Sequence, residues 1–125
     1  MEVKPDIQNR EDVSLLVHCF YERATVDPVI GHFFTTVVKL DWEKHIPLIT
    51  SFWNTLLFGE AGYTGNPMDA HIKLNRLSPM QKEHFDRWVF LWTETIHAHF
   101  AGPKADEAIM RGGNIAQIMH LKLHP

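Results

Sequence analysis

Apolar residues recur at steps of three and four along most of the chain, which is the period of an α-helix. The first such stretch runs from about Asn9 to Val26. Asn9 is the expected N-cap, and Asp27-Pro28 is the expected end. The predicted inward face carries Val13, Leu16, Val17, Phe20, Tyr21 and Ala24. Because Tyr21 lies on this face, its hydroxyl needs a partner, either a backbone group or a ligand in a cavity.

A second helix is predicted from Trp42 to Phe58, with Asp41 as its cap. Pro47 falls within the first two turns, so the helix either begins near Ile46 or bends there. The predicted stripe places a histidine on the same side as large apolar residues: His45, Leu48/Ile49, Phe52/Trp53 and Leu56.

Two further helices are predicted in the second half of the chain. Ser78-Pro79-Met80-Gln81 has the form of a capping box with proline at the first helical position, and Gly102-Pro103 ends the long helix that follows. The last helix extends from Pro103 to about Leu121, and Gly112-Gly113 in it permits close helix contact. Residues 29–34 are expected to form a tight corner or a single helical turn. No strand is predicted, so residues 1–125 are expected to form one all-α domain.

Composition narrows the classes of partner. The net charge is −3 and the Lys and Arg residues are dispersed, which argues against nucleic acid or an acidic membrane surface. Cys19 is the single cysteine, and neither a signal region nor an apolar run long enough to span a membrane is present, so a cytoplasmic protein is expected. The nine histidines and four tryptophans would suit a site for a metal or a large flat ligand.

The stretch 65–74, Gly-Asn-Pro-Met-Asp-Ala-His-Ile-Lys-Leu, predicts a turn followed by a short, half-apolar segment. It presents His71, whose neutral imidazole can bind iron through one nitrogen while the other donates to a carbonyl or carboxylate. Taken alone, a histidine in such surroundings is more often a partly buried side chain than a ligand.

Other metal and nucleophile chemistries lack their motifs. No His-Glu-x-x-His zinc motif occurs, and Glu94-x-x-His97 is the single pair of the kind that a di-iron bundle needs twice. No nucleophile elbow or cysteine–histidine signature is present. What remains is one isolated histidine, together with three residues that carry polar atoms on apolar helix faces: Tyr21, His45 and Trp88. This set of residue types is typical of a haem pocket.

The chain resembles the truncated haemoglobins, and specifically their third group. The resemblance rests on the order and spacing of several short motifs over roughly residues 10–120: Phe20-Tyr21-Glu22, Gly31 with Phe34, Trp42-Glu43-Lys44-His45, Phe52-Trp53, Gly65-Asn66-Pro67 with His71, and His84-Phe85-Asp86-Arg87-Trp88. The implied fold is a globin-like two-over-two helical sandwich around haem b, iron protoporphyrin IX.

The resemblance also implies roles for individual residues. His71 becomes the iron ligand, and Tyr21, His45 and Trp88 become the residues that face a ligand on the other side of the haem. The haem would contact Phe20, Phe34, Phe52 and Trp53, with Tyr63 and Lys73 near its propionates. Pro47 departs from the expected pattern and leaves two orientations open for His45, inward or toward solvent.

Such a pocket would bind O₂, and other diatomic ligands such as NO and CO, reversibly at a five- or six-coordinate iron. Several donors near the ligand favour redox activity on NO or peroxide, as an NO dioxygenase or a peroxidase-like enzyme. An oxygen carrier or store without catalysis is the alternative. A dioxygenase would need an external reductase, because the sequence contains no flavin or nicotinamide domain. A sensor would need an output domain, for which 125 residues leave no space, and a plain helical interaction domain would bind no haem.

Overall fold

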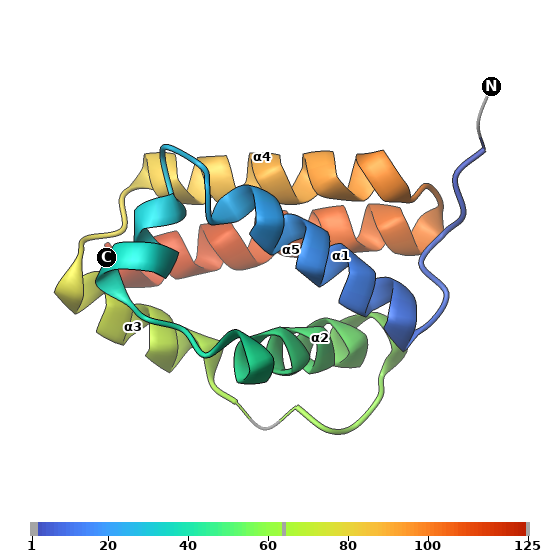
Figure 1. The fold of residues 1–125 in the computed structure, drawn as a ribbon, viewed down its shortest axis with the longest axis horizontal. Coiled ribbons are helices and arrows are strands. Elements are labelled where there is room, and N and C mark those ends of the chain that lie inside the picture. Colours follow the sequence, from blue (N-terminus) through green and yellow to red (C-terminus); the bar gives the residue numbers. More distant parts are fainter. Residues whose placement is uncertain (1–2, 64, 125) are drawn as a thin grey trace.

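Two pairs of helices form the two layers of the fold. The computed structural model describes residues 3–63 and 65–124, and these residues contain no strand. The elements, in chain order, are α1 (Arg10–Ala24), the π-helix η1 (Phe33–Val37), α2 (Trp42–Phe58), α3 (Pro67–Leu77), α4 (Lys82–His99) and α5 (Pro103–Leu123) (Figure 1). No helix in the described part is long and apolar enough to cross a membrane. The predicted all-α fold class is therefore confirmed.

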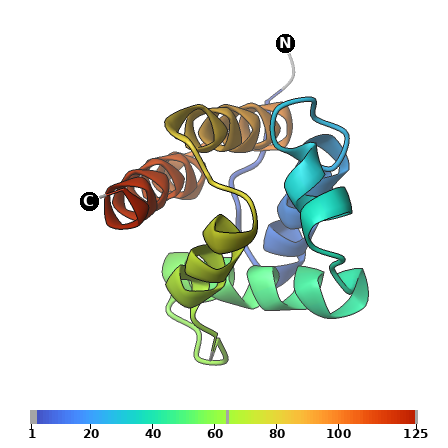
Figure 2. The same ribbon diagram turned by 90° about the vertical axis from the view of Figure 1, so that its left-hand side faces the viewer.

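The pair α4 and α5 packs over the pair α1 and α2, and α1 also contacts α4 directly (Figures 1 and 2). The core lies where the four helices meet. Its fully buried large side chains come from both layers and from the N-terminal segment, and include Trp92, Phe20, Ile7, Leu16 and Ile96.

The starts of α1 and α2 follow the predicted caps. Asn9 Oδ1 accepts the Asp12 N–H, and Asp41 Oδ1 accepts the Glu43 N–H, so each cap uses a first-turn donor that has no partner within its helix. Since α2 begins at Trp42, the alternative start near Ile46 was wrong. Pro47 lies inside α2, where it removes one backbone donor near the N-terminal end.

The predicted start of the long helix was also wrong. Ser78 is the C-cap of α3, and α4 begins only at Lys82 after Gln81. Two contacts hold this connection: Asn75 Oδ1 accepts the Met80 N–H at 2.8 Å, and the Gln81 N–H donates to His84 Nδ1 at 2.9 Å. The tight corner or helical turn expected at residues 29–34 is confirmed: residues 28–30 form a turn, and residues 31–32 are helical and lead into η1.

The N-terminus of α5 is capped from the other end of the sequence. Asp6 accepts the backbone N–H groups of Lys104 and Ala105, at 3.0 and 2.9 Å. Gly102 precedes them with φ 142°, and a Cβ there would lie 2.6 Å from Asp6 Cγ. The N-terminal segment is therefore fastened to the α4–α5 corner by a carboxylate on a helix N-terminus.

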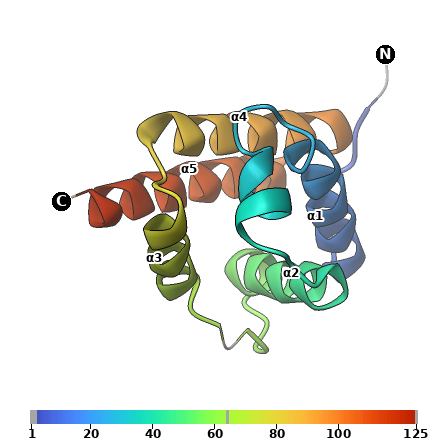
Figure 3. The ribbon, with the colours of Figure 1, turned by 60° about the vertical axis from the view of Figure 1, so that its left-hand side comes forward.

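The short helix α3 is anchored more weakly than the others. Asn66 caps it and Pro67 starts it, so the short segment expected after the turn is a helix. None of its residues is buried. Together with η1 it lies between the layer of α4 and α5 and the helix α2 (Figure 3).

Candidate functional site

A cavity of about 260 Å³ lies between the two layers, beside α3 and η1. Its wall is largely apolar and comes from almost every element of the fold. It is lined by Ile30, Phe33, Phe34, Val38, Leu40, Ile49, Phe52, Trp53, Pro67, Ala70, Leu74, Met80, Phe85, Ile115, Ala116 and Met119. Side chains with polar atoms complete the lining: Tyr21, His45, Tyr63, His71, His84 and Trp88.

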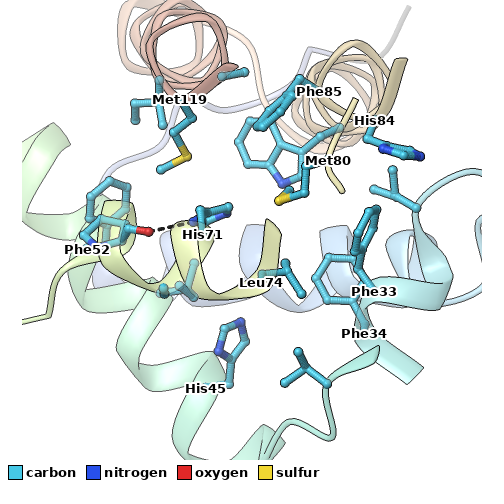
Figure 4. Close-up of a pocket in the computed structure, with 18 of the residues that line it drawn as sticks. Phe33, Phe34, His45, Phe52, His71, Leu74, Met80, His84, Phe85 and Met119 are labelled. Carbon is cyan, nitrogen blue, oxygen red and sulfur yellow. Dashed lines mark hydrogen bonds between the residues drawn. The ribbon is translucent and has the colours of Figure 1, made fainter. Parts of the chain in front are cut away.

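His71 projects into this cavity from α3, and Figure 4 shows its ring surrounded by apolar side chains. Its Nδ1 lies 2.7 Å from the carbonyl oxygen of Pro67. Since a carbonyl only accepts, Nδ1 carries the hydrogen and donates. Burial lowers the pKa of His71, although the bond to Pro67 opposes this effect, so the ring is neutral near pH 7. Nε2 therefore retains a lone pair for a ligand.

Tyr21 and His45 reach the cavity from α1 and α2. The Tyr21 hydroxyl and His45 Nε2 share a hydrogen bond of 2.9 Å, which orients His45 toward the cavity despite Pro47 two residues later. Burial raises the pKa of Tyr21, so its phenol keeps its proton at every physiological pH. Burial lowers the pKa of His45, and repulsion between the His45 and His71 rings when both are protonated lowers it further, which favours the neutral ring. The pair thus supplies an O–H donor and a neutral imidazole.

Trp88, on α4, is a further cavity-lining residue that carries a polar atom. Among the described residues its indole Nε1–H has no hydrogen-bond acceptor, whereas Trp92 donates to the Ala108 carbonyl at 3.0 Å. The donor of Trp88 therefore remains available to a molecule in the cavity.

Phe34 packs edge-on against Tyr21, with ring centres 5.5 Å apart.

The other predicted haem contacts fall into two groups. Phe52, Trp53 and Tyr63 line the cavity. Phe20 does not: it is buried in the core behind Tyr21 and Trp88, with ring centres 5.2 and 5.5 Å away. Lys73 is also outside the lining; its side chain is 70% exposed and pairs with Asp69 at 3.0 Å. It follows His71 by two residues, a step that turns a side chain to the opposite side of a helix.

Several lining residues were missed by the sequence analysis of the site. Ile115, Ala116 and Met119 are apolar residues at helical spacing within the predicted last helix, so that spacing was a usable signal. Met80 and His84 had no such signal, because their positions depend on the misassigned start of α4.

The donor set fits a haem better than a bare metal ion. In the described ranges, no three His, Cys, Asp or Glu side chains converge to hold a metal. One imidazole with a free Nε2 in an apolar cavity is what a metal needs when a macrocycle supplies its remaining ligands. Aromatic and aliphatic walls suit the faces of such a macrocycle.

Comparisons with known proteins lead to the same family as the motifs. No protein-family model matches the chain. The group 3 truncated hemoglobin ctb of Campylobacter jejuni is 28% identical over 111 residues, which cover 86% of this chain and 85% of that protein. The crystal structure of the group III truncated hemoglobin from Campylobacter jejuni has a TM-score of 0.84 and 27% identity, covering 98% of this chain and 96% of that one.

Both comparisons confirm the resemblance to group III truncated haemoglobins, and the second confirms the truncated-globin fold. They support a globin-type protein that binds haem and a ligand on it.

Proposed function

We propose that this chain, similar in sequence and fold to the group III truncated haemoglobins, binds haem b and uses it to bind O₂, NO and CO and to act on NO or peroxide. His71 is the proposed iron ligand. The observation that carries this assignment is its Nε2, which keeps a lone pair inside an apolar cavity because Nδ1 donates to Pro67. The haem, when bound, would supply an iron with a coordination position for a diatomic ligand or peroxide.

The chain's own residues would bind and orient that ligand. Tyr21 O–H and Trp88 Nε1–H are donors at the cavity wall, and His45 lies within hydrogen-bond reach of Tyr21. Phe34, Phe52 and Trp53 would contact the macrocycle and exclude water. Tyr63 would lie near the propionates; Phe20 would support the pocket from behind, and Lys73 would reach a propionate only after leaving Asp69.

Activity on NO or peroxide is favoured over simple carriage by the number of donors at the cavity. Turnover would require electrons from an external reductase or small reductant. Oxygen carriage or storage is the second candidate, because the same donors would also retard release of O₂. Comparing NO consumption by the oxygenated protein with and without a reductant separates the two, since a carrier consumes NO only once.

The assignment of His71 is tested by titrating the protein with hemin and recording ferric and ferrous absorption spectra. Wild type is expected to develop a Soret band, and His71→Ala is expected to lose the histidine-ligated spectrum. His18→Ala is the matched control, because His18 also bonds its Nδ1 to the carbonyl four residues earlier but on an exposed face of α1. A colourless wild type, or an unchanged spectrum in His71→Ala, would refute the proposal.

A further inference from the structure

A second hollow lies between α1 and α2, which pack against each other (Figure 1). It is a groove of about 330 Å³, and it shares no lining residue with the cavity that contains His71. Arg10, Ser14 and His18 line it from α1 at steps of four residues, and side chains between Trp42 and Thr50 line it from α2. We call it the α1–α2 groove. Its volume lies in the range of small-molecule sites.

Thr50 forms the floor of this groove and carries a hydroxyl group without a partner. The residue is 2% exposed, and its Oγ1 makes no hydrogen bond to any residue that the structure describes. A threonine within a helix often bonds to the carbonyl four residues earlier, as Thr95 does to Leu91. Thr50 does not. Burying a hydroxyl group without a hydrogen bond costs free energy, and an acceptor on a ligand in the groove would remove that cost.

Arg10 makes the Thr50 end of the groove positive. Its Nη2 donates to Ser51 Oγ at 3.0 Å, which holds the guanidinium beside the residue that follows Thr50. In the described part of the chain the guanidinium makes no other hydrogen bond, so its remaining N–H groups can donate to a ligand. A planar guanidinium next to a hydroxyl donor is suited to a carboxylate.

The opposite end of the groove offers acceptors. Glu43 lies seven residues before Thr50, which is two turns and about 10 Å along the same side of α2. His18 lies eight residues after Arg10 on α1, and its Nδ1 donates to the Ser14 carbonyl at 2.8 Å. The neutral His18 ring therefore has a lone pair on Nε2. A carboxylate and an imidazole nitrogen both accept, so this end suits a hydroxyl group.

The rest of the groove wall is apolar and comes from Trp42, Ile46 and Pro47. Trp42 is held from the cavity side, because its ring packs edge-on against Tyr21 and His45 at centre distances of 5.1 and 5.7 Å. Pro47, which departs from the expected sequence pattern, adds a rigid ring to this wall. Such a wall is suited to the face of an aromatic ring.

We propose that the α1–α2 groove binds a small aromatic carboxylate that carries a hydroxyl group on the far side of its ring. The carboxylate accepts from Arg10 and Thr50. The ring packs on Trp42 and Pro47, and the hydroxyl group donates to Glu43. One ring with a polar group at each end, and a hydrogen bond beyond each group, spans the distance of about 10 Å between the two ends of the groove. The inference does not depend on the proposed haem function, since the groove and the cavity have separate linings.

The test is a titration of the full chain with 4-hydroxybenzoate, followed by two-dimensional ¹H–¹⁵N NMR. If the protein contains haem, it is reduced and saturated with CO so that the iron is diamagnetic. The signals of the Trp42 indole N–H and the Arg10 Nε–H are expected to shift and to saturate with a Kd of about 0.1–1 mM, which a ligand of about ten non-hydrogen atoms can reach. Phenol lacks the carboxylate and is expected to bind about tenfold more weakly.

Two substitutions test the donors at the Thr50 end. Arg10→Gln removes the cation and is expected to raise the Kd about tenfold or more. Thr50→Val removes the hydroxyl group and is expected to raise the Kd about 3- to 10-fold without loss of folding stability, which urea denaturation measures on the same sample. Arg23→Gln is the matched control, because Arg23 is an exposed arginine on α1 that does not line the groove. It should retain the wild-type Kd.

The absence of a saturable shift at Trp42, a Kd unchanged by Arg10→Gln and Thr50→Val, or shifts confined to residues of the cavity would overturn the inference. None of these results would alter the assignment of His71, which the hemin titration tests.

Discussion

The Tyr21 hydroxyl and His45 Nε2 lie 2.9 Å apart, and their hydrogen bond joins α1 to α2 at the wall of the cavity. A ligand accepting from Tyr21 would compete with His45 for the phenol. Tyr21 and His45 together therefore determine how strongly the Tyr21 hydroxyl can donate to a ligand. Each of the two residues can be substituted separately.

Replacing the phenol of Tyr21 tests its role as a donor. In Tyr21→Phe, the O₂ dissociation rate of the hemin-loaded, reduced protein is expected to rise about 10- to 100-fold, because a hydrogen bond to a charged acceptor contributes about 1.5–3 kcal/mol. Stopped-flow displacement of O₂ by CO measures the rate. CO dissociation, which depends less on a donor, is the internal control. An unaltered O₂ rate would remove Tyr21 from the binding role.

Two neighbouring glycines in α5 should respond in opposite directions to the same substitution. Gly112→Ala is expected to destabilise the protein by about 1–3 kcal/mol, since its Cβ would lie 2.7 and 2.8 Å from Trp92 Cδ1 and Nε1. The Cβ of Gly113→Ala would meet none of the described neighbours within 4 Å, so this substitution is expected to stabilise the helix by about 0.5–1 kcal/mol. Urea denaturation followed by circular dichroism gives both values. Equal effects would contradict the close approach of α5 to Trp92.

Thr50 is expected to be a position where an apolar residue is tolerated. Its Oγ1 is buried and has no hydrogen-bond partner among the residues that the structure describes, so Thr50→Val removes a polar atom whose burial is not offset by a hydrogen bond. The free energy of unfolding is expected to stay equal or rise by up to about 1 kcal/mol. Thr95→Val is the comparison, because Thr95 Oγ1 donates to the Leu91 carbonyl at 2.6 Å and its loss should cost about 1 kcal/mol. A larger cost at Thr50 would point to an unseen partner.

Asp27 should make stability depend on acid pH. Burial alone would raise the pKa of Asp27, but bonds from Arg87 and from the Val29 and Ile30 N–H groups outweigh it and hold the pKa below its ordinary value. A carboxylate whose pKa is lowered by folding stabilises the protein above its unfolded pKa of about 3.9, and that contribution disappears as pH falls through the folded value.

Asp27→Asn is therefore expected to lower the free energy of unfolding at pH 7 by about 1–3 kcal/mol, and the difference from wild type should shrink below about pH 4. Urea denaturation at several pH values measures this. Asp86→Asn removes an exposed partner of Lys82 and should change stability by less than about 0.5 kcal/mol at either pH. A difference at Asp27 that did not vary with pH would show that packing, and not charge, is responsible.

Sequence reasoning succeeded where structure is set by nearby residues. Asn9 and Asp41 each cap a helix by accepting a backbone N–H two or three residues later, as the local pattern predicted. The prediction that Ser78 caps the start of the long helix was wrong because a serine can stand either at the end of one helix or at the start of the next. Ser78 ends α3, and the contact from Asn75 to Met80 delays the next helix to Lys82.

The candidate site was predictable in its polar residues and less so in its walls. Tyr21, His45, His71 and Trp88 all reach the cavity as the family resemblance implies. One face of α2 packs into the core and another lines the cavity, so a single apolar stripe does not describe this helix. Ile46, Thr50 and Leu57 are buried away from the cavity, while His45, Phe52 and Trp53 line it. Periodicity alone cannot separate two such faces, because the boundary between them depends on where α1 and α3 lie.

The helix that carries His71 buries none of its own residues. Eleven residues are too few for a helix to persist alone in water, so α3 would owe much of its order to whatever fills the adjoining space. Backbone amides of α3 would then exchange with deuterium quickly in the empty protein and slowly once the cavity is filled. Uptake of the cofactor would, on this view, complete the folding of the segment that grips it.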